Sequence, residues 1–556
     1  MIRIISITAL FFFNGFLIRS QTDKPKLVVG VVVDQMRFNH LYKYQERFSN
    51  GGFKRIMQEG FNYKNTNYNY VPTVTAAGHA SIYTGTTPSA HGIIGNTWYQ
   101  RSSKQIITNI EDNNELLIGT DAADSYGGSP RNLLTTTITD QLRMGTNFRA
   151  KVISVSLKDR GAILPGGHSA NAAYWHDWKS SPGNFVSSSY YMDELPNWVT
   201  KYNKLEKSNS YLTDSWSTLY PIESYIMSAP DDNNYERAIA GKTSATFPYD
   251  YKSMRERYKE IGAEFQLIWV TPAGNSLLTD FAIEAIKNEG LGTDEITDFI
   301  NISYSVPDVI GHTFGPQSVE FEDVILRLDR DIESLLKSLD ATVGTGNYLL
   351  FLTSDHGSVP VASYLADNKL PAGIANIKKH EVALLSHLNS KYGTNQWIEN
   401  FDGESVYLNQ DLIKQKKLSL RAVQQEAADF LITLEEITGA LIASDLQSQS
   451  YSYGMNQMIQ NGYHSKRSGD VILIFKPGFV PNLDPRITMQ NIKGTTHGSG
   501  YAYDTHVPML WFGNSIPKGK SVRKVSVIDI APSIAQILNI SYPSGATGEP
   551  LTELFD

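Results

Sequence analysis

The chain of 556 residues contains no cysteine. It therefore forms no disulfides, has no thiolate nucleophile and offers no cysteine ligand to a metal ion. Its formal net charge of −8 argues against a protein that binds nucleic acid through bulk electrostatic attraction. An acidic chain also repels phosphate groups, so chemistry on a phosphate would require a locally positive site.

Long apolar runs are scarce, and the most apolar stretch lies near the N-terminus at Ile4–Ile18. It follows the basic start Met1-Ile2-Arg3 and ends in a polar break. A short basic start and about 7–15 apolar residues are typical of a secretory signal. A membrane span would need roughly 18–20 apolar residues. We expect residues 1–20 to be a signal peptide, the mature chain to be periplasmic or secreted, and no stable membrane insertion.

Apolar runs rich in β-branched residues recur along the chain and predict buried strands. Helical spacing of apolar residues follows at 321–339 and at 528–538, where Asp529 is the expected N-cap. Strands alternating with helices predict an α/β fold with a mainly parallel central sheet flanked by helices. The predicted strands are Lys26–Val33, Lys151–Leu157, Phe265–Val270, Tyr348–Thr353, Val471–Phe475 and Pro508–Phe512.

Two stretches break this alternation, at about 161–260 and 360–485. The first is rich in Tyr, Ser, Asn, Asp and Trp, and the second holds a separate mixed pattern. We interpret both as insertions beside or over a site in one catalytic domain, residues 21–556, rather than as independent domains.

Six side chains of metal-binding type stand at or near predicted strand ends, where ligands collect in parallel sheets. Three carboxylates and three imidazoles suit two divalent ions of the zinc type. Metal pairs held about 3.5–4 Å apart are a recurrent device for cleaving phosphate esters. The six residues are Asp34, Asp308, His312, Asp355, His356 and His497.

Each motif also has a simpler interpretation when taken alone. Asp308 and His312, four residues apart, fit a helix N-cap and a surface histidine equally well. Asp355 ends a buried apolar run, where a carboxylate must be satisfied by a partner. His506 is the main rival of His497 as a ligand, but it begins an apolar strand and suits a structural role better.

A hydroxyl nucleophile is available at Thr75, in the run Pro72–Ala80. The run predicts a helix start, whose free N–H groups and partial positive charge suit an alkoxide or a phosphoryl oxygen. Thr75 could equally serve only as an N-cap. His79, one turn further along, suits packing better than metal ligation.

Three further residues could bind phosphate oxygens. Asn96 could donate its amide, although it also suits a turn. Lys158 and Arg160 follow a predicted strand and, in extended chain, would face the same side. Both cations suit a phosphate dianion, although a solvated surface pair is the alternative. With two divalent ions they would leave the site positive despite its three carboxylates.

Six runs in order resemble the alkaline phosphatase superfamily, most closely the phosphate-irrepressible, periplasmic enzymes of the PafA type. The resemblance covers essentially the whole mature chain. The runs are VVVDQMR, PTVTAAGHASIYTGTTPSAHGIIGN, SLKDRGAILPGG, SVPDVIGH, TSDHG and GTTHGSGYAYDTHVP.

The resemblance implies an alkaline phosphatase that hydrolyses small-molecule phosphate monoesters, with two zinc ions and a phospho-threonine intermediate on Thr75. The implied ligands of one zinc are Asp308, His312 and His497. The implied ligands of the other are Asp34, Asp355, His356 and Thr75. The implied contacts to the transferred phosphoryl group are Asn96, Lys158 and Arg160.

Other activities fit less well. A phosphodiesterase or nucleotide pyrophosphatase would share the metals and the threonine, but a diester carries less charge for Lys158 and Arg160 to meet. A sulfatase needs a modified Cys or Ser, which Thr75 cannot supply. A non-catalytic binding protein of this fold would normally have lost a metal ligand, and all six are present.

Overall fold

The computed structural model describes residues 24–120 and 126–555. The predicted signal peptide, residues 1–20, lies outside this part of the chain. None of the helices in the described residues combines the length and the apolar character of a membrane span.

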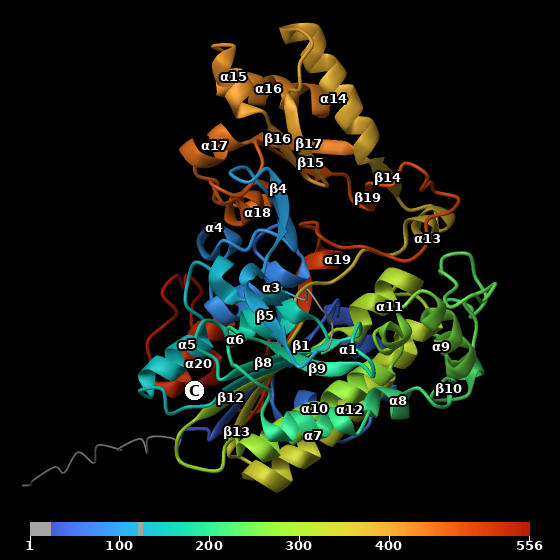
Figure 1. Cartoon of the computed structure of the whole chain (residues 1–556), viewed down its shortest axis with the longest axis vertical. Coiled ribbons are helices and arrows are strands. Elements are labelled where there is room, and N and C mark those ends of the chain that lie inside the picture. Colours follow the sequence, from blue (N-terminus) through green and yellow to red (C-terminus); the bar gives the residue numbers. More distant parts are fainter. Residues whose placement is uncertain (1–23, 121–125, 556) are drawn as a thin grey trace, which may run out of the picture.

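A mixed sheet of twelve strands forms the centre of the molecule (Figure 1). Its middle is parallel and is flanked on both sides by antiparallel strands. In spatial order the parallel strands are β13 (Tyr348–Thr353), β1 (Leu27–Val33), β12 (Asp298–Tyr304), β7 (Val152–Ser156) and β8 (Ala172–Asp177). The flanking strands include β20 (His506–Gly513), β2 (Phe61–Asn67) and β9 (Asn184–Ser188).

The central strand β1 is buried along its whole length because helices cover both faces of the sheet. Val29 and Val31 belong to the core beneath α10 (Ala273–Glu289) and α12 (Val319–Leu339). Val28 and Val32 belong to the opposite core, with α3 (Thr75–Thr84) and α20 (Ile530–Leu538). Burial on both faces explains why this strand is continuously apolar, and it confirms the predicted α/β class.

One sequence prediction of local structure is wrong, and a second is confirmed in position only. Phe265–Val270 is not a strand, since Glu264–Ile268 forms a 3₁₀ helix whose apolar side chains pack into the core. A short apolar run does not distinguish a buried helix from a buried strand. Asp529 occupies the predicted N-cap position of α20, but its side chain makes no cap hydrogen bond there. Its carboxylate accepts from the backbone N–H groups of Ser526 and Glu549 instead.

The stretch 360–485 builds most of a second layer at the top of Figure 1. Its antiparallel sheet has a core of its own and packs under α14 (Ile377–Tyr392) and α16 (Leu420–Leu431). The four strands are β15 (Ile398–Asp402), β16 (Ser405–Leu408), β18 (Val471–Phe475) and β17 (Ile437–Ile442). In the other predicted insertion, 161–260, β8 and β9 belong to the main sheet.

Candidate active site

The predicted metal-binding side chains converge at one edge of the sheet. Asp34 directly follows β1, and the Asp355-His356 pair follows the neighbouring strand β13. Strand β12, on the other side of β1, leads into α11 (Val306–Phe314), which carries Asp308 and His312. His497 comes from the loop before α19 (Ala502–Thr505). Carboxyl ends of adjacent parallel strands meet at one edge, as the sequence predicts.

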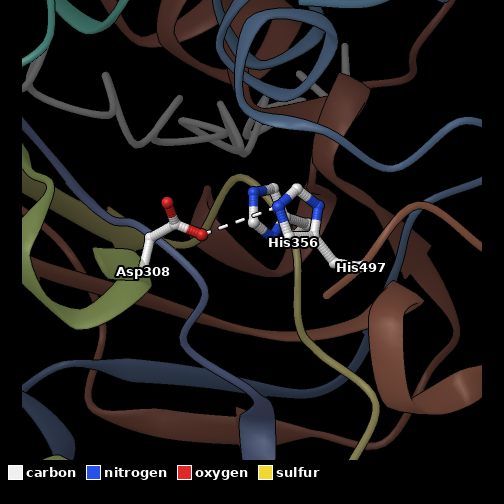
Figure 2. A group of neighbouring side chains, drawn as sticks. All are labelled: Asp308, His356 and His497. Atoms are coloured by element: carbon white, nitrogen blue, oxygen red, sulfur yellow. Dashed lines mark ion pairs between the residues drawn. The ribbon is translucent and has the colours of Figure 1, made fainter. Parts of the chain in front are cut away.

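Two groups of these side chains each place three ligand atoms within 4.8 Å of one another. One group is Asp308, His356 and His497, shown in Figure 2, and the other is Asp34, Asp355 and His356. Oδ1 of Asp34 and Oδ2 of Asp355 are buried without a hydrogen-bond partner. Buried carboxylate oxygens of this kind need a compensating charge, and the mixed oxygen and nitrogen donors fit divalent transition ions.

All three imidazoles present Nε2 to the carboxylates. The Nδ1 atoms of His312, His356 and His497 lie 2.8, 2.9 and 2.9 Å from backbone carbonyl oxygens. A carbonyl only accepts, so each Nδ1–H donates, and the Nε2 lone pair of the neutral ring is free for a metal. The Nε2 atom of His312 lies 3.1 Å from Oδ1 of Asp308, and the Nε2 atom of His497 lies 3.6 Å from the same oxygen.

His356 belongs to both groups, and its ring stacks on that of His497, with centroids 3.5 Å apart and an interplanar angle of 13°. The resemblance pairs Asp308 and His497 with His312 instead. His312 contacts the same Asp308 oxygen but is the most exposed of the three imidazoles. The stacked pair thus joins the two groups into one cluster.

Lys158 lies inside this cluster. Its Nζ donates to Oδ2 of Asp34 and to Oδ2 of Asp308, each at 2.6 Å. Burial alone would lower the pKa of Lys158, but these two carboxylates outweigh it and raise that pKa. Burial together with the charge of Asp34 raises the pKa of Asp355 well above its usual range. The carboxylates at this edge therefore favour bound positive charge.

Thr75 begins α3, and its Oγ1 lies 3.5 Å from Nε2 of His356. The N-cap position belongs to Val74, so the alternative role of Thr75 as an N-cap is wrong. The residue is 1% exposed. Its hydroxyl stands beside the metal-type ligands at a helix start, where N–H groups are free to meet a negative oxygen.

Asn96 lies next to this helix start, where its Oδ1 accepts from the Ala76 N–H at 2.9 Å. That bond orients the side chain and leaves its amide N–H groups to donate elsewhere.

Arg160 belongs to a helix, so the prediction that Lys158 and Arg160 share an extended segment is wrong. Lys158 is the N-cap of α6 (Asp159–Gly166), and Arg160 is the second residue of that helix. Nε of Arg160 is buried without a hydrogen-bond partner.

Gln35 is a site residue that the sequence did not reveal. Its backbone N–H donates to Oδ1 of Asp355 at 3.2 Å, and its Nε2 donates to Oδ1 of Asp308 at 2.6 Å. It adopts a positive φ of 65°, uncommon for a residue other than glycine. The only sequence signal is its place directly after Asp34.

Two other histidines take the structural roles that the sequence predicts. The ring nitrogens of His79 lie 2.8 Å from Thr75 O and 2.8 Å from Ser303 Oγ. Nε2 of His506 lies 3.0 Å from Lys64 O, and its ring stacks on Phe38. Neither residue belongs to a metal-type group among the described residues.

Residues 28–500 match the family model described as type I phosphodiesterase / nucleotide pyrophosphatase. The chain belongs to this family. Alkaline phosphatase PhoV of Synechococcus elongatus is 42% identical over 96% of this chain and 93% of its own length. Alkaline phosphatase PafA of Elizabethkingia meningoseptica is 39% identical over 96% and 94%.

The crystal structure of wild-type PafA superposes with a TM-score of 0.89 at 39% identity, covering 96% of this chain and 99% of that one. The predicted resemblance to PafA-type enzymes and the predicted enzyme class, alkaline phosphatase, are confirmed.

Proposed function

We propose that this chain hydrolyses small-molecule phosphate monoesters to inorganic phosphate through a phospho-threonine intermediate on Thr75, at a site that holds two zinc ions. The observation that carries the proposal is the position of Thr75 Oγ1, 3.5 Å from His356 Nε2. His356 belongs to both metal-type groups, so this hydroxyl lies where two ions would be held. The relatives named alkaline phosphatases support the same reaction.

The ligands proposed for one zinc are Asp308, His312 and His497. The ligands proposed for the other are Asp34, Asp355, His356 and Thr75. When bound, such ions would favour the ionised form of the Thr75 hydroxyl and offset the charge of the departing alcohol oxygen. The donor set of carboxylate oxygens and imidazole nitrogens is the set that zinc accepts when no cysteine is present.

The chain's own residues perform the remaining work. Thr75 Oγ1 gives its proton to solvent and attacks phosphorus in line, while the bond from phosphorus to the alcohol oxygen breaks; that oxygen takes up a proton from water and leaves as the alcohol. Asn96, Lys158 and Arg160 donate to the non-bridging oxygens and hold the phosphoryl group in place. Water then attacks the phospho-threonine, which releases phosphate and restores the hydroxyl.

A phosphodiesterase or nucleotide pyrophosphatase is the alternative that the family description raises. The buried ammonium of Lys158, 4% exposed, favours a substrate with more negative charge on its non-bridging oxygens, as a monoester has. The test that distinguishes a monoesterase from a diesterase is to compare how fast the zinc-loaded protein hydrolyses an aryl phosphate monoester and the matching diester. We expect the monoester to be preferred, and a preference for the diester would reverse the assignment.

The proposed location is the periplasm or the outside of the cell, because residues 1–20 have the composition of a secretory signal. N-terminal sequencing of the exported protein would test this. A mature chain that begins near Ser20 or Gln21 is expected, and an intact Met1 would contradict it.

A further inference from the structure

A pocket of about 300 Å³ adjoins the candidate active site and includes Asn96 and His497 in its wall. It lies between the main body and the layer formed by 360–485. The backbone N–H of Val71 donates to Met458 O at 3.1 Å, which fixes one rim of the pocket against that layer. An ester whose phosphoryl group is held at Thr75 and Asn96 would extend its alcohol part into this space.

The walls of the pocket are mainly apolar and aromatic. Side chains from both layers supply them, so the pocket exists only where the layers meet. The apolar and aromatic side chains of the wall include Val71, Ile94, Ile472, Phe475, Tyr501 and Tyr503.

Three carboxylates also line this pocket, and none of them forms an ion pair with a cation of the described residues, although the charge of Arg37 acts on Asp504. Among the described residues, the carboxylates of Asp402 and Glu404 make no hydrogen bond or ion pair. Burial, then the charges of Asp402 and Asp504, raise the pKa of Glu404 to about 8. Asp504 is 1% exposed; its Oδ2 accepts from Ser499, whereas its Oδ1 is buried without a partner.

Glu404 stands close to the loop that carries His497. Its Oε1 lies 3.4 Å from the position that a Cβ on Gly498 would occupy, and Gly498 directly follows His497. The one lysine in the pocket wall, Lys476, places its Nζ 5.8 Å from the centre of the Phe479 ring. It forms no ion pair with these acids, so it does not neutralise them.

The three acids do not form a third metal-type group of the described residues. Within the described residues, their oxygens belong to neither group whose ligand atoms converge. Carboxylates that do not converge on one point but lie among aromatic rings suit an organic ammonium group instead. Such a group is stabilised both by attraction to the carboxylates and by contact with the ring faces.

We propose that this pocket binds the alcohol part of phosphate monoesters that carry an ammonium group, such as esters of amino alcohols, and disfavours alcohol parts that carry a second anion. The inference rests on the proposed function, because the ester must be held for hydrolysis at Thr75. Asp402 and Glu404 would meet the ammonium group, and the aromatic side chains would enclose it.

The test compares phosphocholine with its neutral isostere, in which a tert-butyl group replaces the trimethylammonium group. The two esters have nearly the same shape and differ in charge. The ammonium group also makes choline the better leaving group, so the change in their kcat/KM ratio from wild type to variant reports what the pocket contributes to the charge preference. The assay is run above the pKa of Glu404, so that its carboxylate is ionised. We expect the zinc-loaded wild type to prefer phosphocholine by about tenfold.

Glu404→Gln and Asp402→Asn should each lower this ratio by about threefold to tenfold while turnover of the isostere is kept. Kept turnover of the isostere shows that the variant is folded. Glu435→Gln is the matched control, because Glu435 is an exposed acid of the same layer outside the pocket. Its ratio should equal that of the wild type.

The outcomes separate this inference from the proposed function. Hydrolysis of both esters at equal kcat/KM, or a ratio that neither pocket variant changes, would overturn the inference and leave the phosphatase assignment standing. No hydrolysis of these esters or of a simple aryl monoester would overturn the proposed function, and this inference with it.

Discussion

The imidazoles of His356 and His497 stack with ring centroids 3.5 Å apart, although 140 positions of the chain separate them. One ring comes from the end of a central strand and the other from a loop before β20. Their Nδ1 atoms are held by the carbonyl oxygens of Gly357 and Thr73, so both Nε2 atoms face the carboxylates. The stack makes the two metal-type groups one structural unit.

Removal of metal should abolish activity and destabilise the protein. Elemental analysis of the purified chain should give two zinc ions, and exhaustive chelation should lower both turnover and the unfolding temperature, since buried carboxylates would lose their compensating charge. Zinc added back should restore both. A stoichiometry of one metal, or full activity after chelation, would contradict the proposed site.

His497→Ala should weaken metal binding strongly, whereas His506→Ala should leave zinc content unchanged and reduce stability. The reason is that His497 presents Nε2 to Asp308, while His506 contacts Lys64 O and Phe38. Zinc content by elemental analysis and thermal unfolding of both variants distinguish the roles. The reverse pattern would exchange them.

Lys158→Ala and Arg160→Ala should each reduce monoester turnover by about one to two decades, from the loss of roughly 1.5–3 kcal/mol per charge-assisted contact. In the double variant the ratio of kcat/KM for monoesters to that for diesters should fall, because the two cations stabilise the smaller charge of a diester less. The measurement is kcat/KM on the matched aryl pair. Equal losses on both substrates would show that these residues position the substrate without selecting it.

The metal-free protein should lose stability as the pH rises. Burial, above all, raises the pKa of Asp331 to about 7 and that of Asp504 to about 7. Their folded-state pKa values exceed those of the unfolded chain, so their stabilising contribution is complete in acid and is lost as the pH rises through about 7.

Urea unfolding of the metal-free chain at several pH values from about 4, near the ordinary carboxyl pKa, to about 8, just above the raised values, checks this prediction. Asp331→Asn, which removes one of these groups away from the metal-type cluster, should make the decline shallower. A free energy of unfolding that rises with pH over this range would contradict it.

Much of the sheet and the cluster could be predicted because local sequence determines them. β1 is apolar throughout since both faces are buried, and Asp34 and Asp355 mark the ends of neighbouring parallel strands. Gln35 could not be predicted, because a neutral amide gains its role only when Asp308 comes within 2.6 Å of it. The run at Phe265 was predicted as a strand because it is apolar, but its side chains are apolar because they are buried, and a buried helix has the same composition.

The pocket was beyond sequence reasoning for a similar reason. Val71 and Glu404 lie in different layers and meet only through the packing of 360–485 against the main body. The unpaired state of Glu404 is a property of that packing and has no signature in the residues around it. Arg160 likewise required the structure, which places it in the first turn of α6.

The most direct test of the central claim is acid-quenched labelling of the zinc-loaded enzyme with a monoester carrying radioactive phosphate, followed by peptide mapping. We predict one labelled peptide with phosphate on Thr75, and no label with Thr75→Ala, which should lose nearly all turnover while retaining both metals. Thr73, two residues away with its hydroxyl bonded to Ser499 O, should remain unlabelled. Label on Thr73 or on a serine would contradict the account.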